Sequence, residues 1–324
     1  MEKCFAIFPH NGKNVSTLWK TFFIHSSGRH EPPPMISKRF KYLRPEDVRA
    51  LTALEFVPRS LAEGVLAGRH RSSARGASIE FRDYRQFVPG DDPALIDWRA
   101  YARTDRHYLR TYEQETNMEC HLFLDSSASM GFGEGTTKLD YASFFCAALA
   151  YLVTRGNDRV SLQIFDDRIR FHAPPGSTRR HLHNLLHALE TNVPGGQTKL
   201  AEALQRSHPL LKRRGTLVVL SDFMDDPGSI FKALNPYLHR GFRIHLFHIL
   251  HPDEIDLPHR GLLTFRDLET GSRLIAHTEE IRAAYAEAMR AHVAGLRHFA
   301  TRRGIDYTLT STTSPHLALF DRLT

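Results

Sequence analysis

One carboxylate and two hydroxyls occupy alternate positions in the segment FLDSSASM, at Asp125, Ser127 and Ser129. The segment continues the apolar run CHLFL, which has the pattern of a buried strand. Oxygen donors without His or Cys among them suit Mg²⁺ or Mn²⁺ in octahedral geometry and suit zinc poorly. A Ser-rich segment after a strand can also be a solvated turn, so the rest of the chain must decide between the two interpretations.

Two later segments offer donors of the same chemical kind. Thr198 follows Gly195-Gly196-Gln197, and Asp222 follows the apolar run TLVVLS. In an open α/β sheet, ligands bind where the loops beyond the carboxyl ends of the strands converge, so we expect the five side chains to meet at a loop edge outside the core. Only two of the five donors are charged, so a divalent cation held there would keep exchangeable waters, one of which a carboxylate of a partner could replace.

Strand-like and helix-like segments alternate from Glu119 to the C-terminus, which predicts an α/β fold with a doubly wound, mostly parallel sheet. The segment Phe165-Asp166-Asp167-Arg168-Ile169 has the pattern of a tight hairpin turn, so one antiparallel edge strand is expected. The expected strands span 120–124, 160–165, 169–172, 216–220, 243–250 and 307–310, and the expected helices span 139–154, 179–189, 200–211, 229–238 and 279–303.

The composition divides the chain into three parts. Residues 1–35 are expected to be a weakly ordered extension, with Met35 as an alternative start. Residues 36–115 are expected to form a small, β-rich module that opens with a helix at 45–54, and residues 116–324 form the α/β domain. Because Pro89-Gly90 is a turn signal, we expect short β segments on both sides of it, the second around Ile96-Asp97-Trp98.

The segments Asp-x-Ser-x-Ser, Gly-Gly-x-Thr and Ser-Asp together resemble the metal-ion-dependent adhesion site of von Willebrand factor A domains. The blocks EFRDYRQFVPGDDPALIDWRAYART and YLRTYEQETNMECHLFLDSSASM are similar to the bacterial family called domain of unknown function fifty-eight. The resemblance implies a von Willebrand A-type fold and a non-catalytic, protein-binding role. It also implies a MoxR-type AAA+ ATPase as partner, the pair acting like a chaperone on an unidentified client. The implied ligands of Mg²⁺, with Mn²⁺ as the alternative, are Asp125, Ser127, Ser129, Thr198 and Asp222.

Charged and aromatic residues are dense in the module upstream of the α/β domain. Such a cluster is typical of a solvated β module whose charges pair with each other. It also fits a surface that engages the ATPase or its client, because Trp and Arg dominate binding hot spots. The sequence leaves both interpretations open. The candidate contact residues are Arg82, Tyr84, Arg85, Asp91, Asp92, Asp97 and Trp98.

Two other function classes are alternatives for this chain. The net charge of +7 and the pI near 9.4 could indicate nucleic-acid binding. Residues 1–115 hold 19 Lys and Arg against 14 Asp and Glu, but no aromatic RNA-binding motif, zinc-finger spacing or helix-turn-helix pattern accompanies them. A metal-dependent hydrolase would usually add carboxylates or a second metal, and neither serine has the elbow of a nucleophile. No small-molecule substrate is expected.

Several other signals are explained by structure alone. The loop from Gly131 to Lys138 resembles a phosphate loop, but Leu139 stands where a Walker A motif needs Ser or Thr. The histidines of HLHNLLH and HLFHILH are expected to be structural or to lie on the surface. The three cysteines form no Cys-x-x-Cys pair, and no apolar run is long enough for a membrane span, so a cytoplasmic location is expected. Peripheral association with the inner membrane through a partner stays open.

Overall fold

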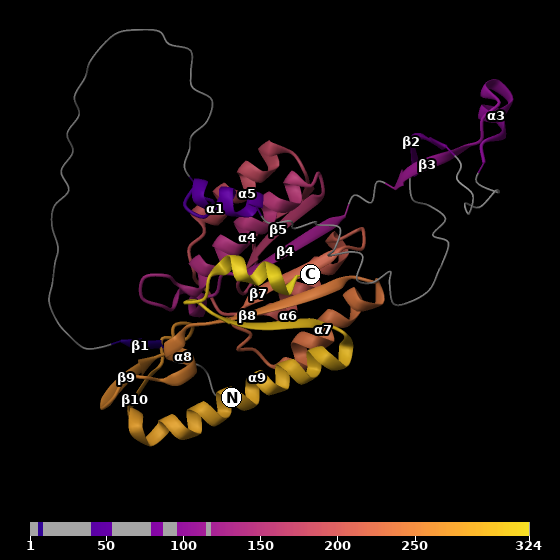
Figure 1. Cartoon of the computed structure of the whole chain (residues 1–324). Helices are drawn as coiled ribbons and strands as arrows, with labels where there is room; N and C mark the ends of the chain where they lie inside the picture. The colour runs from indigo at the N-terminus through magenta and orange to yellow at the C-terminus, as the bar shows by residue number, and fades with distance from the viewer. Residues whose placement is uncertain (1–5, 9–39, 54–78, 87–95, 115–117, 324) are drawn as a thin grey trace, which may run out of the picture.

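The computed structural model describes residues 6–8, 40–53, 79–86, 96–114 and 118–323. Its largest element is a six-stranded sheet with the strand order β11-β8-β7-β4-β5-β6 (Figure 1). In chain order the strands are β4 (Glu119–Asp125), β5 (Arg159–Phe165), β6 (Ile169–Gly176), β7 (Thr216–Ser221), β8 (Arg243–Leu250) and β11 (Asp306–Ser311).

All neighbouring strands of this sheet are parallel except β5 and β6, which form an antiparallel hairpin. The predicted α/β fold and its antiparallel edge strand are therefore confirmed. If the six strands are numbered 1 to 6 in chain order and the sheet is read from β6 to β11, their order is 3-2-1-4-5-6, as in doubly wound folds. In such sheets the crossovers reverse direction between the two central strands, which here are β4 and β7.

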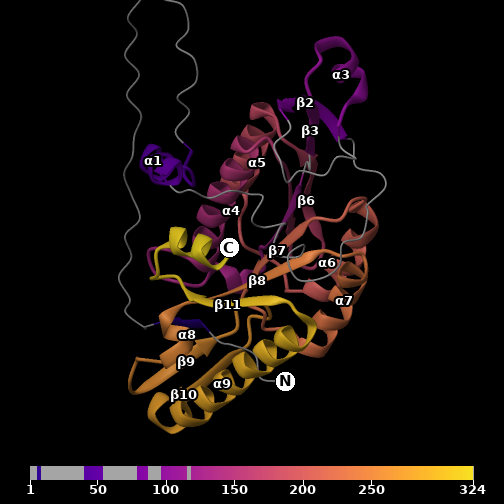
Figure 2. The ribbon, with the colours of Figure 1, turned by 45° about the vertical axis from the view of Figure 1, so that its right-hand side comes forward.

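Helices cover both faces of the sheet, and Figure 2 shows α4 (Lys138–Arg155) and α5 (Arg179–Thr191) on one side, with α6 (Leu200–Ser207) and α7 (Pro227–His239) on the other. The long helix α9 (Thr278–Arg303) packs on the side of α7. Successive residues of β4 point to opposite faces, so Leu122 and Leu124 join the core with α4, while Phe123 joins the core with α6 and α7. Burial on both faces explains why β4 is apolar almost throughout.

The predicted helices are confirmed with small shifts at their ends. Side chains cap several of them: Thr137 accepts a hydrogen bond from the N–H of Asp140 at the start of α4, and Thr178 does the same for His181 in α5. The helix predicted at 200–211 is shorter, because α6 ends at Ser207 and a 3₁₀ turn, His208–Leu210, follows.

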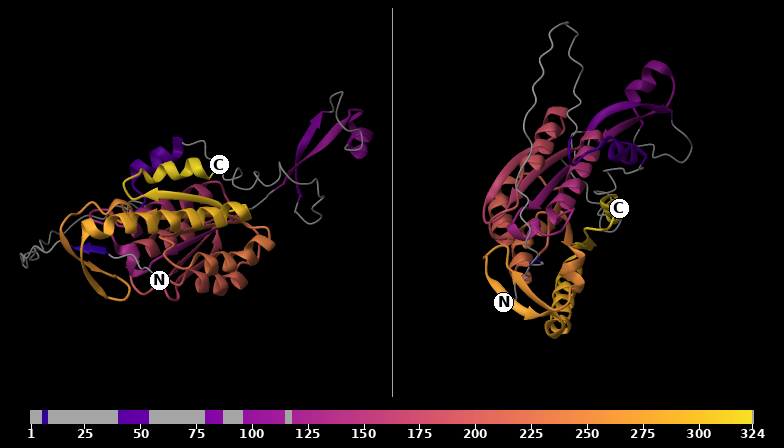
Figure 3. Two further views of the ribbon diagram at one scale, coloured as in Figure 1. Left: turned by 90° about the horizontal axis from the view of Figure 1, so that it is seen from below. Right: turned by 90° about the vertical axis from the view of Figure 1, so that its left-hand side faces the viewer.

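The segment around residues 96–98 was predicted to be a β segment, and this is wrong for Trp98. A helix, α3 (Trp98–Thr104), begins there, because Asp97 precedes it and its Oδ1 accepts the N–H of Ala100 at 3.3 Å. The helix lies between β2 (Ile79–Gln86) and β3 (Tyr108–Gln114), which form an antiparallel pair. Figure 3 shows this hairpin and α3 standing away from the six-stranded sheet.

Helix α1 (Pro45–Ala53), predicted at 45–54, packs on the α/β domain. Leu51 is fully buried and belongs to the same core as α4, and the Tyr42 hydroxyl donates to Asp140 at 2.6 Å. The C-terminal 3₁₀ segment, His316–Arg322, covers the same helix, with Phe320 against Phe145. Residues 40–53 therefore pack on α4 as part of the folded α/β domain.

A second, three-stranded sheet was not predicted. It consists of β1 (Ala6–Phe8), β9 (Leu262–Arg266) and β10 (Arg273–His277), and all its pairs are antiparallel. The sheet follows α8 (Pro252–Asp256) and precedes α9. Three residues of the predicted N-terminal extension thus form a strand beside β9. Among the described residues, no helix combines the length and the apolar character that crossing a membrane requires.

We predict that Leu51→Ala lowers the free energy of unfolding of the whole α/β domain by about 2–5 kcal/mol, because it opens a cavity between α1 and α4. The change is measured by urea denaturation followed by far-UV circular dichroism. Arg49→Ala, on the exposed side of the same helix, is the control and should change the free energy by no more than about 0.5 kcal/mol. Equal, small effects of both variants would contradict the packing of α1 on this core.

Candidate metal-ion site

Two carboxylates face each other across the centre of the sheet. Asp125 is the last residue of β4, and Asp222 directly follows β7, the strand beside it. Asp125 accepts two hydrogen bonds, from the Ser221 hydroxyl at 2.6 Å and from the Ser127 N–H at 2.9 Å. Burial, and then the nearby charge of Asp222, raises the pKa of Asp125 to about 7. The two carboxylates therefore repel each other in a site that water does not screen.

The two predicted serine donors lie at the same place. The Ser127 and Ser129 hydroxyls are 3.0 Å apart, at the start of a 3₁₀ turn, Ala128–Gly131, that follows β4. The Ser129 hydroxyl is near Asp222 and favours its charged form. The structure thus brings together four of the five predicted donors.

Thr198, the fifth predicted donor, comes from a loop that is held against the loop after β4. The N–H of Gly195 donates to the Ser126 carbonyl at 2.9 Å, and the N–H of Ala128 donates to the Gly196 carbonyl at 3.0 Å. Gly196 has φ +75°, and a Cβ atom there would lie 2.9 Å from Asp166, so glycine is required. The Thr198 hydroxyl itself donates to Glu269 at 2.7 Å, a residue that the sequence analysis did not single out.

The expectation that these donors lie at a loop edge outside the core is wrong for most of them. Asp125, Ser127 and Asp222 are fully buried, and Thr198 is 8% exposed; only Ser129 is half-buried. The loop 195–198 is hydrogen-bonded to the loop after β4, and Lys138 at the start of α4 contacts Asp222 after β7. Asp125 and Asp222 are therefore best replaced by residues of similar size, because a smaller side chain would also disturb the packing of the buried cluster.

Lys138, at the start of α4, is a site residue that the sequence analysis missed. Its fully buried ammonium donates to Asp222 Oδ2 and to Glu254 Oε1, both at 2.7 Å. Burial opposes its charge, but the two carboxylates outweigh burial and raise the pKa of Lys138 above its ordinary value. The same ammonium overcomes the effect of burial on Asp222 and lowers the pKa of that carboxyl. The partners lie 84 and 116 residues away in sequence, so no local signal predicts the contacts.

Negative charge is only partly compensated in this buried cluster. The Lys138 ammonium contacts Asp222 and Glu254, while Asp125 lies beside Asp222 on the neighbouring strand. Burial raises the pKa of both Asp125 and Glu254, and the neighbouring His248 adds no charge because burial lowers its pKa to about 3. Within the described part of the chain, Asp222 Oδ1 is buried without a hydrogen-bond partner. An excess of negative charge and an unused carboxylate oxygen fit a divalent cation better than they fit a closed structural network.

The donor set also suits a hard cation. The described part of the chain contains no group of three or more His, Cys, Asp or Glu residues arranged to hold a metal ion, so a cation here must use hydroxyl oxygens beside the two aspartates. Ser127, Ser129 and Thr198 supply such oxygens. Mg²⁺ and Mn²⁺ accept oxygen ligands of this kind and keep waters in the remaining positions.

The candidate partner-binding residues of the upstream module are spread over its elements. Arg82, Tyr84 and Arg85 lie on β2, whereas Asp91 and Asp92 lie outside the described residues. Asp97 is buried at the start of α3. Trp98 is 61% exposed, and its ring is nearly perpendicular to that of Tyr101. An exposed Trp is a suitable contact residue for a partner.

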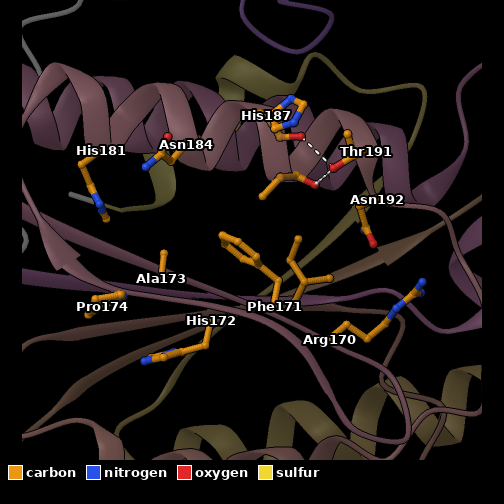
Figure 4. Close-up of a pocket in the computed structure, with 12 residues that line it drawn as sticks. Arg170, Phe171, His172, Ala173, Pro174, His181, Asn184, His187, Thr191 and Asn192 are labelled. Atoms are coloured by element: carbon orange, nitrogen blue, oxygen red, sulfur yellow. Dashed lines mark hydrogen bonds between the residues drawn. The ribbon is translucent and has the colours of Figure 1, made fainter.

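A separate hollow of about 730 Å³ lies between β6 and α5 (Figure 4). The His181 ring nitrogen on its wall forms a 2.7 Å hydrogen bond with the Val160 carbonyl, and Arg170 donates to the Val193 carbonyl at 2.7 Å. His187, also on α5, is exposed. On β8, burial lowers the pKa of His245 to about 4 and keeps its ring neutral, as it does for His248. These four histidines are structural or lie on the surface, as predicted.

Comparison with known proteins identifies the family. Residues 83–295 match the family described as "Protein of unknown function DUF58", and the chain belongs to that family. Two uncharacterized proteins, Mb1516 of Mycobacterium bovis and Rv1480 of Mycobacterium tuberculosis, are each 30% identical to it over 285 residues. The aligned residues cover 86% of this chain and 88% of each relative.

Solved structures of low sequence identity also resemble the chain. BatB from Bacteroides thetaiotaomicron is 18% identical, with a TM-score of 0.46, over 64% of this chain and 97% of BatB. The VWA domain of SpRpn10 is 10% identical, with a TM-score of 0.40, over 64% of this chain and 94% of that domain.

We predict that Lys138→Met lowers the free energy of unfolding by about 3–5 kcal/mol, because it leaves Asp222 and Glu254 buried without their counter-charge. Adding Glu254→Gln to this variant should recover part of the loss, since one buried charge is then removed. Denaturant unfolding of the two single variants and the double variant measures the coupling. Lys199→Met, which removes an exposed lysine, is the control. Additive effects of the two substitutions would contradict a direct interaction between Lys138 and Glu254.

Proposed function

We propose that this chain is a non-catalytic, Mg²⁺-dependent protein-binding adaptor. The observation that carries the proposal is the pair of buried aspartates at the carboxyl ends of β4 and β7: burial and then the charge of Asp222 raise the pKa of Asp125, and Asp222 Oδ1 has no hydrogen-bond partner among the described residues. A cation can bind a carboxylate of a partner protein only if its own ligands leave part of its positive charge uncompensated. Two aspartates and three hydroxyls leave such a cation only partly neutralised.

Neighbouring groups orient the two aspartates among the proposed ligands. Asp125, Ser127, Ser129, Thr198 and Asp222 would hold Mg²⁺, or Mn²⁺ in its place. The Ser221 hydroxyl and the Ser127 N–H orient the Asp125 carboxylate, and Lys138 fixes one oxygen of Asp222 and leaves the other available. When bound, the cation offers a position for a carboxylate oxygen of a partner protein.

The proposed partner is a MoxR-type AAA+ ATPase, and the pair would mature or remodel a client complex in the manner of a chaperone. Membership in the DUF58 family supports this proposal through the resemblance described above. The hairpin of β2 and β3, with the exposed Trp98 beside it, offers a second contact surface at a distance from the metal-ion site. We place the complex in the cytoplasm or at the inner membrane through a partner.

We predict that a MoxR-type ATPase is recovered from a native lysate on the immobilised wild-type chain in Mg²⁺, and that the recovery is lost in EDTA and with Asp125→Asn. The Asn variant keeps the size of a fully buried side chain and removes its charge, so it weakens the cation site with little change in packing. Mass spectrometry identifies the bound proteins.

Glu287→Ala is the control for loss of one negative charge, because Glu287 is exposed on α9. It should bind as the wild type does. Thermal unfolding of the same samples reports the cation separately, since Mg²⁺ should raise the Tm of the wild type and of Glu287→Ala but not that of Asp125→Asn. Equal recovery under all conditions would exclude the metal-ion site as the docking point.

A further inference from the structure

The hairpin of β9 and β10 reaches the metal-ion site from a distant part of the chain. It follows β8 and α8, and Figure 1 shows it beside α8, which directly follows the carboxyl end of β8. Its turn carries Glu269, which is 71 residues from Thr198 in sequence and in direct contact with it. The hairpin is thus the element that brings an additional carboxylate to the proposed ligands.

The turn fixes the position of Glu269. Asp267, which is buried, accepts the N–H of Glu269 at 2.9 Å on one carboxylate oxygen and the Thr270 hydroxyl on the other. The N–H of Gly271, with φ +73°, donates to the Asp267 carbonyl at 2.9 Å. These hydrogen bonds to Asp267 fix the backbone conformation of the turn at Glu269.

The Glu269 carboxylate binds Thr198 with both oxygens. Oε1 accepts the hydroxyl proton at 2.7 Å, and Oε2 accepts the backbone N–H at 3.2 Å. A hydroxyl that donates its proton to Glu269 keeps its oxygen lone pairs for another acceptor of electrons, such as a cation. The contact is therefore compatible with Thr198 as a metal ligand, and it places a carboxylate next to that ligand.

A second carboxylate lies in the same region. Asp225 accepts the N–H of Leu200 at 3.2 Å, and Glu269 and Asp222 are close enough to raise its pKa, after burial, to about 6. Negative charge thus accumulates on the side of the site that faces the hairpin. In a chain without a cation this arrangement is unfavourable, and Asp222 Oδ1 is buried with no hydrogen-bond partner among the described residues.

We propose that Glu269 is a resident carboxylate that occupies the position of a partner's acidic side chain, so that the β9–β10 turn must move aside when a partner binds. The inference rests on the metal-ion site proposed above. Within that site it assigns a half-buried carboxylate of this chain to the position that a partner's carboxylate would take. An internal carboxylate competes at a high effective concentration, so it selects for partners that bind by more than one contact.

A simpler role for Glu269 is to cap α6. The N–H groups of Thr198 and Leu200 lie at the start of that helix and attract negative charge. A capping role predicts that loss of Glu269 lowers stability and leaves the surroundings of a bound cation unchanged. The two roles therefore predict different numbers of exchangeable waters on a bound cation when Glu269 is removed.

The test uses Mn²⁺ as the probe and measures the relaxation of water protons, which reports how many exchangeable waters the bound ion carries. In Glu269→Ala we expect a higher relaxivity of bound Mn²⁺ than in the wild type, because water takes the position that the carboxylate leaves. Added acetate should then lower the relaxivity of the variant and leave that of the wild type unchanged. Glu280→Ala, which removes an exposed carboxylate at the start of α9, is the matched control.

Three outcomes are distinguishable. Equal relaxivity and an equal response to acetate in wild type and Glu269→Ala, with Mn²⁺ bound to both, would overturn the resident-carboxylate proposal and leave the metal-ion site intact. Absence of Mn²⁺ binding in the wild type would overturn both proposals. If Glu269→Ala does not fold, Glu269→Gln keeps the shape of the side chain and the same comparison applies to it.

Discussion

The buried ammonium of Lys138 is the interaction on which the centre of this molecule depends. It joins α4, the end of β7 and α8 through two 2.7 Å contacts with carboxylates that would otherwise destabilise the interior. Asp125 is a further buried carboxylate beside Asp222, and burial together with the charge of Asp222 raises its pKa to about 7. We propose that a divalent cation relieves this repulsion, and the proposed function rests on that electrostatic constraint.

The topology explains why the cluster lies where it does. The segments after β4 and β7 leave the sheet toward opposite faces, since α4 covers one face and α7 the other. A space therefore opens between the ends of these two central strands, and Asp125 and Ser221 meet across it. The loop 195–198 is hydrogen-bonded to the loop after β4, and the turn of β9 and β10 contacts Thr198 through Glu269. Residues from separate parts of the chain thus meet at one small polar site.

Most of the fold could be predicted because periodicity is a local property. β4 and β7 are apolar runs that end in Asp125 and Ser221, and their ends are accurate to one residue. The positions of Asp125, Ser127, Ser129 and Asp222 also follow from strand ends, whereas Thr198 lies in the loop between α5 and α6. The charge of Lys138 could not be assigned a role, since its partners are distant in sequence, and its place in a Gly-rich loop suggested only a comparison with nucleotide-binding loops.

The β9–β10 hairpin had a usable signal that was missed. Thr270-Gly271-Ser272 is a turn sequence, and apolar residues lie on both sides of it. The burial of Asp125 could not be predicted, because the segments that cover it come from other parts of the chain. The contact between Glu269 and Thr198 has the same origin.

The central claim is that a divalent cation binds between Asp125 and Asp222, and crystals grown in Mn²⁺ test it most directly. Anomalous diffraction measured at the manganese absorption edge locates the ion without reference to any partner. The account predicts one strong anomalous peak among the oxygens of Asp125, Ser127, Ser129, Thr198 and Asp222. A peak elsewhere, or a water-free site in which Asp222 Oδ1 has a protein hydrogen-bond donor, would contradict it.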